Sequence, residues 1–256
     1  MCATVSPERP VSPVRPEGPT SPVTPVLQAG YWWTPQKIDW YVRASKCSDF
    51  HEKLACEIAG MVPREKSILE VGCGLGYITA QLAKMGYDVC GIDNDEKAIK
   101  RAHELHEGLS RQSGSKRLFA LEDYRTSHRR ADVVLAVFCG RIDEEGLGAF
   151  ERLANERVIY IVSQHKSNSL RHDRTAGICA YLEENGYRFT LKELTMHFDQ
   201  PFESREEATR FLELQHGDGN LPVKKNEGAG KDQYPYVFEN EKKMSCLLYT
   251  SDAADE

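Results

Sequence analysis

The sequence lacks a long hydrophobic run, a signal peptide and a strong excess of charge of one sign. None of its apolar stretches reaches the roughly 20 residues that a membrane-spanning helix needs, and its first residues lack the apolar core of a signal peptide. The formal net charge of −6 gives no general case for nucleic-acid binding. We therefore expect a soluble, cytoplasmic protein with no membrane partner, and the charge argues against nucleic acid as a partner.

Paired cysteines are also absent, because none of the eight cysteines forms a Cys-x-x-Cys motif. Cys73 and Cys90 fall in stretches that we expect to be buried, and Cys56 falls in a predicted helix. Scattered cysteines of this kind are typical of reduced core residues in a cytosolic protein. The sequence therefore predicts no metal site.

Both ends of the sequence differ in composition from the middle. From Pro7 to Pro25 a proline falls at every third position, which is the repeat of a polyproline II helix. This stretch is either a ligand for a proline-binding module or a solvated tail that buries nothing, and its composition favours the tail. Residues 246–256 look like a translated sequencing adapter, so we exclude them from functional reasoning.

Between these ends, stretches with strand and helix patterns alternate. Strands alternating with helices indicate a parallel sheet with helices on both faces. The expected domain limits are a disordered proline-rich tail over 1–26, a helical segment over 27–66, an α/β domain over 67–245 and a non-native tail over 246–256. We expect strands at 67–71, 88–92, 117–121, 131–138, 157–162 and 187–197, and helices from Pro35 and at 48–61, 76–85, 95–107, 143–154, 172–184 and 204–214.

A glycine-rich turn follows the first predicted strand and is the most informative feature of the sequence. Gly72, Gly74 and Gly76 have the spacing G-x-G-x-G. The dinucleotide-binding fingerprint G-x-G-x-x-G/A would need a small residue where this sequence has Tyr77. Glu70, at the end of the strand, would repel a pyrophosphate but would suit an ammonium group. A nicotinamide-dependent oxidoreductase is therefore a less favoured alternative.

With Glu70, the glycine turn and Asp93 after the second strand, residues 48–200 resemble the class I S-adenosylmethionine-dependent methyltransferases. The resemblance implies a doubly wound, mostly parallel seven-stranded sheet of the Rossmann-like type, with an N-terminal helical lid over residues 27–66. It also implies a last strand that inserts antiparallel between the fifth and sixth strands. Residues 242–249 would have to form it, although they run into the adapter-like tail.

The resemblance also implies S-adenosylmethionine as the cofactor and a role for each site residue. Glu70 would bind the ammonium group, and Asp93 would accept hydrogen bonds from both ribose hydroxyls. Asp93 could alternatively cap the next helix. Ile92 or Asn94 would flank the adenine, Asp123 would bind its amino group, and Tyr124 would pack on its ring. The remaining cofactor contacts are assigned to Gly72, Cys73, Gly74, Gly76, Tyr77 and Phe138, of which Phe138 could equally be a core residue.

The methyl acceptor is less defined by the sequence. Methyl transfer needs an aligned nucleophile and exclusion of water rather than a fixed triad, and the fourth strand lacks the Asn/Asp-Pro-Pro-aromatic motif of enzymes that methylate amide or exocyclic amino nitrogens. We therefore predict a small-molecule acceptor. His51, His165 and Tyr41 are candidate catalytic residues. The aromatic residues Tyr31, Trp32, Trp33, Trp40 and Tyr41 could line the acceptor pocket or pack on the sheet, and residues 200–202 could form a pocket loop.

Two further alternatives remain at this stage. Arg125, Arg129 and Arg130, with His128, form a basic cluster that could serve an RNA or protein methyltransferase, although a solvated basic loop explains it as well. The absence of an evident catalytic residue also leaves open a non-catalytic protein that binds S-adenosylmethionine. The oligomeric state cannot be predicted from the sequence.

Overall fold

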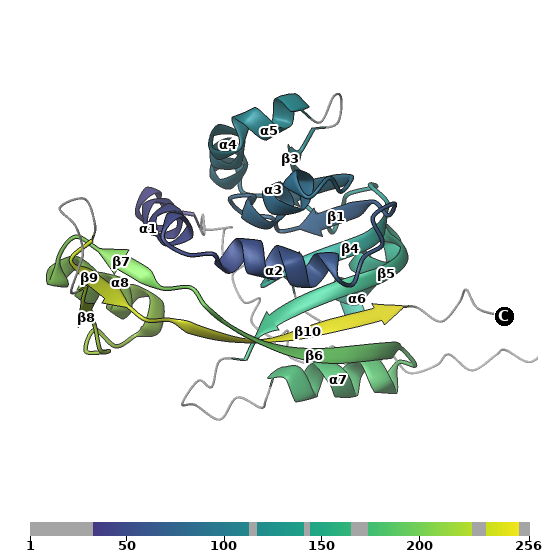
Figure 1. Ribbon diagram of the computed structural model, residues 1–256. Coiled ribbons are helices and arrows are strands. Elements are labelled where there is room, and N and C mark those ends of the chain that lie inside the picture. Colours follow the sequence, from purple (N-terminus) through teal and green to yellow (C-terminus); the bar gives the residue numbers. More distant parts are fainter. Residues whose placement is uncertain (1–32, 113–116, 141–143, 165–173, 227–233, 251–256) are drawn as a thin grey trace, which may run out of the picture. The chain divides into compact units, whose positions relative to one another are not determined.

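The computed structural model describes residues 33–112, 117–140, 144–164, 174–226 and 234–250 (Figure 1). The proline-rich stretch, Tyr31, Trp32 and His165 therefore lie outside the described residues. Within the described ranges no helix is both long and apolar enough to cross a membrane.

The central element is a seven-stranded sheet in the order β3-β2-β1-β4-β5-β10-β6. Strands β1 to β5 pair in parallel, whereas β10 pairs antiparallel with both β5 and β6. This order confirms the predicted mostly parallel sheet with its late antiparallel insertion. The strands are β1 (Ile68–Val71), β2 (Val89–Asp93), β3 (Phe119–Leu121), β4 (Ala131–Val137), β5 (Ala154–Ser163), β6 (Arg188–His197) and β10 (Glu241–Thr250).

Strand β10 corrects the expected end of the domain. It continues through Thr250, past residue 245, where the adapter-like tail was expected to begin. Cys246, Leu247 and Tyr249 are almost completely buried, and Leu247 lies opposite Tyr160 of β5 and Leu191 of β6. Residues 246–250 therefore belong to the sheet and contribute to its core, because their apolar side chains fill the centre of the layer.

Helices cover both faces of the sheet. Apolar residues of α2 (Phe50–Ala59), α3 (Tyr77–Lys84) and α4 (Glu96–Leu105) pack on one face. Those of α6 (Glu144–Leu153) and α7 (Arg174–Glu184) pack on the other. The helix that follows β1 packs on the first face and the helix that follows β4 packs on the second, although β1 and β4 are neighbours in the sheet. The short helix α5 (Glu107–Gln112) was not predicted.

A second, smaller sheet follows β6 and was not predicted. It has three antiparallel strands, β7 (Gln200–Phe202), β9 (Tyr236–Phe238) and β8 (Lys224–Lys225), in that order. Helix α8 (Arg205–His216) packs on it through Phe202, Leu212 and Phe238. We call these strands and α8 the accessory unit. The prediction of a pocket loop at 200–202 is wrong, because all three residues are buried in β7.

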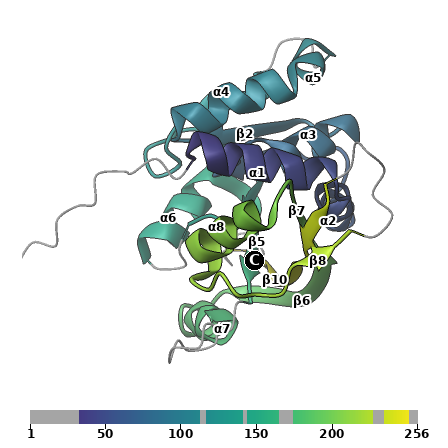
Figure 2. The same cartoon turned by 90° about the vertical axis from the view of Figure 1, so that its left-hand side faces the viewer.

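Helix α1 (Pro35–Lys46) contacts β7 of the accessory unit (Figure 2). Thr34 caps this helix, with its hydroxyl accepting a hydrogen bond from the Lys37 amide at 3.2 Å. Trp40 and Arg43 of α1 both donate hydrogen bonds to Glu207 of α8, each at 2.9 Å. The helices of residues 27–66 are therefore present, while their function as a lid stays a prediction.

Candidate functional site

The predicted site residues gather where β1 and β4 end. The helices that follow these two neighbouring strands leave toward opposite faces of the sheet. In open α/β sheets such a switch point opens a crevice outside the carboxyl ends of the strands, where ligands bind. The glycine turn after β1 and residues 138–140 after β4 form its two sides.

The backbone of the glycine turn requires residues without a side chain. Gly72 and Gly74 have φ angles of 65° and 54°, which other residues rarely adopt. A Cβ atom on Gly72 would lie 2.0 Å from the Cys139 sulfur, and one on Gly74 would lie 2.9 Å from Cζ2 of Trp33. The turn is therefore fixed between the end of β4 and the indole ring of Trp33.

Asp93 connects this turn to the start of α4. One carboxylate oxygen accepts a hydrogen bond from the Gly74 amide and the other from the Asp95 amide, both at 2.8 Å. The helix cap is Asp95, whose carboxylate accepts hydrogen bonds from Lys97 and Ala98, so the capping alternative for Asp93 is wrong. Burial raises the pKa of Asp93. Each oxygen retains a second lone pair that could accept a ligand hydroxyl.

Glu70 is a buried carboxyl group, with 3 % of its surface exposed. It accepts a hydrogen bond from the Thr79 hydroxyl. Burial raises the pKa of Glu70 to about 7, against the opposing effect of the Thr79 hydrogen bonds. Among the described residues no lysine, arginine or histidine forms an ion pair with Glu70. A cationic ligand group at this position would stabilise its charged form.

In the loop after β3, the Asp123 carboxylate has charged and polar side-chain partners, in contrast to the buried Glu70 carboxyl group. The Asp123 carboxylate pairs with Arg125 and accepts a 3.4 Å hydrogen bond from Asn94, and the hydrogen bond from Arg125 lowers the pKa of Asp123. Arg129 pairs with Glu122 in the same way, and Arg130 donates to Asn155 at 2.7 Å. The basic cluster is thus largely paired within its own loop.

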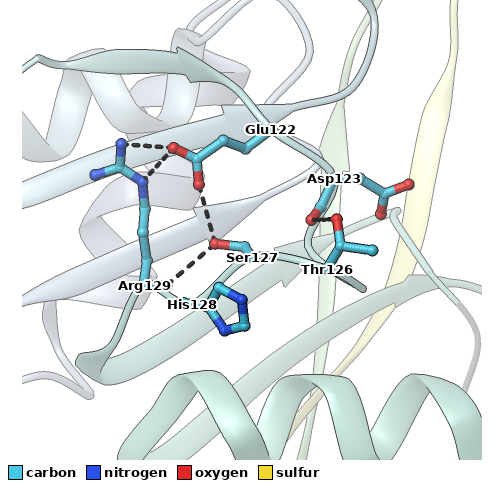
Figure 3. Close-up of a pocket in the computed structure, with 6 residues that line it drawn as sticks. All are labelled: Glu122, Asp123, Thr126, Ser127, His128 and Arg129. Atoms are coloured by element: carbon cyan, nitrogen blue, oxygen red, sulfur yellow. Dashed lines mark hydrogen bonds and ion pairs between the residues drawn. The ribbon is translucent and has the colours of Figure 1, made fainter.

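A surface cavity of about 500 Å³ borders Asp123 (Figure 3). Ser127 donates a 3.0 Å hydrogen bond to Glu122 at its edge. The neighbouring Tyr124 ring packs on Phe150, with ring centroids 5.3 Å apart. The cavity places polar groups beside Asp123, on the side of the site that was assigned to adenine. Its lining residues are Glu122, Asp123, Thr126, Ser127, His128 and Arg129.

Tyr41 and His51, from α1 and α2, form a hydrogen-bonded pair. The Tyr41 hydroxyl lies 2.9 Å from Nε2 of His51, and the imidazole stacks on Tyr77 with centroids 4.7 Å apart. Burial lowers the pKa of His51 to about 3, so the imidazole is neutral at physiological pH. Burial and the negative charge of Glu70 raise the pKa of Tyr41. The pair is therefore uncharged, and Tyr41 is close enough to Glu70 for the Glu70 charge to raise its pKa.

The predicted aromatic and turn residues divide between site and core. Trp33 contacts the glycine turn, and its ring meets that of Tyr41 edge-on at 5.3 Å. Trp40 is 2 % exposed and packs on Phe211 of the accessory unit, so it does not line this site. Cys73 packs in the core cluster, whereas Phe138 is 48 % exposed and is not a core residue.

Two residues of the site were missed by the sequence analysis. Thr79, which binds Glu70, lies in the first turn of α3, and its position nine residues after an acid could have suggested the contact. Cys139 packs against Gly72, and nothing local in the sequence reports a contact between β1 and β4. In the described part of the chain, no three His, Cys, Asp or Glu residues are placed to hold a metal ion.

Part of the sequence matches a known protein family and curated proteins. Residues 68–155 match the family described as "Methyltransferase domain". The sequence is 43% identical over 63 residues to a ubiquinone biosynthesis O-methyltransferase of Thiobacillus denitrificans, covering 25% of this chain and 27% of that protein. It is 31% identical over 132 residues to the Psychrobacter arcticus protein of the same name, covering 45% of this chain and 46% of that protein. The chain thus spans less than half the length of these curated relatives.

Solved structures show the same fold at low sequence identity. The YcgJ protein of Bacillus subtilis has a TM-score of 0.51 and 11% identity, covering 79% of this chain and 98% of that one. A second solved structure is described as "Conversion of a Disulfide Bond into a Thioacetal Group during Echinomycin Biosynthesis", and it also has a TM-score of 0.51. It is 16% identical, with 79% of this chain and 82% of that one covered.

Proposed function

We propose that the chain is a class I S-adenosylmethionine-dependent methyltransferase, and that it transfers a methyl group from S-adenosylmethionine to an oxygen atom of a small molecule. The observation that carries this proposal is the contact of Asp93 with the Gly74 amide, beside the buried Glu70. The names of the curated relatives, which are O-methyltransferases, support oxygen as the accepting atom.

The acidic residues of the site match the positively charged and hydroxyl groups of S-adenosylmethionine. Glu70 binds the ammonium group, because a buried carboxyl group with a pKa near 7 gains most from a positive partner. Asp93 binds the ribose hydroxyls through the lone pairs that its backbone contacts leave free. Gly72 and Gly74, with their positive φ angles, set the tight bend of the turn that would hold the ligand. When bound, the cofactor supplies a methyl group attached to a positively charged sulfur, which is a good leaving group.

On the acceptor side, Tyr41 and His51 orient the substrate. The pKa of His51, about 3, is too low for an efficient general base at neutral pH, so its role is to hold the Tyr41 hydroxyl in place. Glu70, Asp93 and the glycine turn would hold the methyl donor, and the acceptor hydroxyl would release its proton to bulk water when its oxygen takes the methyl group. The rings of Trp33 and Tyr41, which meet edge-on beside the glycine turn, would limit the access of water from that side.

Calorimetry with S-adenosylhomocysteine tests the cofactor assignment. We expect binding by the wild-type protein and a loss of about tenfold or more in Asp93→Asn, because charge-assisted hydrogen bonds are lost. Glu104→Gln removes an exposed carboxylate that pairs with Arg101 and is the control, with unchanged binding. A folded wild-type protein that does not bind S-adenosylhomocysteine would contradict the proposal.

Release of S-adenosylhomocysteine from S-adenosylmethionine, measured with a metabolite extract, tests turnover. We expect product that depends on both the extract and the enzyme. Binding without turnover would instead make the chain a non-catalytic S-adenosylmethionine-binding protein. Salt-dependent binding to RNA would favour a nucleic-acid substrate, which the pairing of Arg125 and Arg129 with acids of their own loop argues against.

A further inference from the structure

Lys242 lies at the edge of the sheet where the parallel strands end. It is the second residue of β10, and the carbonyl oxygen of its neighbour Lys243 accepts a 2.8 Å hydrogen bond from the amide of Gln164, the residue that follows β5. Figure 1 shows β10 entering the sheet at this place from the accessory unit. Ligands bind beyond the carboxyl ends of the strands in sheets of this kind, so Lys242 stands on the ligand side.

The pairing of the strands shows which face of the sheet the Lys242 side chain occupies. Residues two apart in a strand point to the same face, and Met244 of β10 packs in one core cluster with Phe50 of α2. Lys242 also lies directly opposite Met196 of β6, which packs on that cluster. The side chain of Lys242 is therefore on the face that α2 covers, beside two methionine side chains.

The aromatic residues around Tyr41 and His51 continue this surface. Phe198 follows Met196 by two residues and packs on the same core cluster. Its ring centroid lies 5.2 Å from that of Tyr41 and 5.3 Å from that of His51. Diagonal neighbours across two strands are within reach of long side chains, so Lys242 and Phe198 are close enough to border one ligand site together with the Tyr41 and His51 pair.

In the part of the chain that the structure describes, no acidic residue pairs with the Lys242 ammonium group. The other lysines nearby do have partners. Lys243 is exposed and pairs with Glu241 at 3.4 Å, and Lys192, on the α2 face of β6, pairs with Glu57 of α2. Lys242 is partly buried, and burial lowers its pKa. A charged group that has lost part of its water without gaining a partner is stabilised by a ligand of opposite charge.

The strand order separates Lys242 from the proposed cofactor residues. Neighbouring strands lie about 4.8 Å apart, so β10, three strands from β1, is roughly 14 Å from the strand that carries Glu70. In S-adenosylmethionine the carboxylate and the ammonium group are attached to the same carbon atom. When Glu70 binds that ammonium group, the carboxylate beside it lies too far from Lys242, which points to the acceptor as the anionic ligand.

We propose that Lys242 binds a carboxylate group of the methyl acceptor, so that the acceptor is a small hydroxylated carboxylic acid. This inference rests on the proposed function and names the class of its substrate. Hydrogen bonds between an ammonium and a carboxylate are charge-assisted, and apolar surroundings such as the two methionines strengthen them. A neutral amide of the same shape would displace water from Lys242 without supplying a negative charge, so it would bind less well.

Thermal unfolding of the full chain detects carboxylate binding without turnover. The probes are 3,4-dihydroxybenzoate, mandelate and 3-hydroxybutyrate, each compared with its primary amide, with and without S-adenosylhomocysteine. We expect at least one acid at about 10 mM to raise the unfolding temperature by about 2 °C or more, and its amide to raise it far less.

Two variants of adjacent lysines assign the effect to Lys242. Lys242→Met removes the charge but keeps a long, unbranched side chain, and the rise caused by the acid should disappear. Lys243→Met makes the same change on the opposite face and is the matched control, in which the rise should persist. In Lys242→Met, kcat/KM for methyl transfer to the acid should fall about tenfold or more, whereas the affinity for S-adenosylhomocysteine should stay within about twofold.

The inference is wrong if no acid raises the unfolding temperature of the wild-type protein more than its amide does, or if the rise persists in Lys242→Met. It is also wrong if the affinity of Lys242→Met for S-adenosylhomocysteine falls in parallel with kcat/KM, because Lys242 would then serve the cofactor. Failure of the wild-type protein to bind S-adenosylhomocysteine would instead contradict the proposed function, and the measurements without this compound would still decide whether Lys242 binds carboxylates.

Discussion

The indole ring of Trp33 lies directly against Gly74, so that a Cβ atom on this glycine would stand 2.9 Å from the ring atom Cζ2. The Trp33 amide also donates a 3.4 Å hydrogen bond to Asp95. A ligand that approaches Gly74 from this side must displace the indole. The Trp33 indole therefore covers this side of the glycine turn.

The first prediction concerns the rate of ligand binding. Because a required conformational change slows association, Trp33→Ala should bind S-adenosylhomocysteine at least about threefold faster than wild type. Stopped-flow fluorescence measures this rate. Trp40→Phe, which alters a tryptophan packed on the accessory unit, should leave the rate unchanged. Equal rates in wild type and Trp33→Ala would mean that the ring does not block the approach.

The second prediction concerns the pH dependence of stability. The pKa of Glu70 is raised to about 7 in the folded protein, so the folded state holds its proton more strongly than the unfolded state. The resulting stabilisation is fully present below about pH 4.5 and is lost as the pH rises through 7. Relative to Glu70→Gln, the wild-type protein should lose about 3 kcal/mol of unfolding free energy across this range.

Urea unfolding of wild type and Glu70→Gln at several pH values measures this difference. His51 titrates with the opposite sign, because its pKa is lowered and its contribution is lost as the pH falls below about 6.5. Both proteins retain His51, so its effect cancels in the comparison. A constant difference between pH 4.5 and 7.5 would show that folding does not raise the pKa of Glu70.

The third prediction concerns the attachment of α1 to the accessory unit. The Arg43 side chain is 9% exposed and pairs with Glu207, which is 19% exposed. Glu207→Gln removes the partner of this guanidinium on α8 while Asp39 and Glu203 remain beside it, and we expect a loss of about 1–2 kcal/mol. Chemical denaturation measures the loss. Arg210→Gln, at an exposed position of the same helix, should change stability little, and similar losses in both variants would contradict the assignment.

The fourth prediction concerns the residues that were expected to be a non-native tail. Leu247 is completely buried in β10 and lies opposite Leu191, which is 44% exposed. Leu247→Ala should lose about 2–5 kcal/mol through the cavity that it creates, whereas Leu191→Ala should lose far less. Thermal and urea unfolding of the pair give the comparison. A Leu247→Ala protein as stable as wild type would place β10 outside the folded sheet.

Local patterns predicted most of the main sheet. The apolar runs of β1 and β4 and the caps of α1 and α8 have clear signals within a few residues. The strands of the accessory unit lacked such local signals, because β8 is a pair of lysines and β7 contains a proline. These strands form through tertiary contacts, which override weak local preferences.

The candidate site was predictable to the extent that its residues follow strand ends. Glu70, Gly74 and Asp93 lie at or just after the ends of the neighbouring strands β1 and β2. The hydrogen bond between Tyr41 and His51 joins two helices, and the contact of Cys139 with Gly72 joins β4 to β1. Such contacts depend on packing between elements. The φ angle of Phe138 likewise depends on its neighbours, since the residue type favours a different conformation.

The position of β10 has a consequence for synthesis on the ribosome. Strand β6 is the edge of the seven-stranded sheet, and β10 is its neighbour there. Both β5 and β6 emerge from the exit tunnel well before residues 241–250, so each exposes an unpaired edge while translation continues. Open edges of this kind attract other nascent chains. We therefore expect the sheet to close after β10 emerges and molecular chaperones to protect it until then.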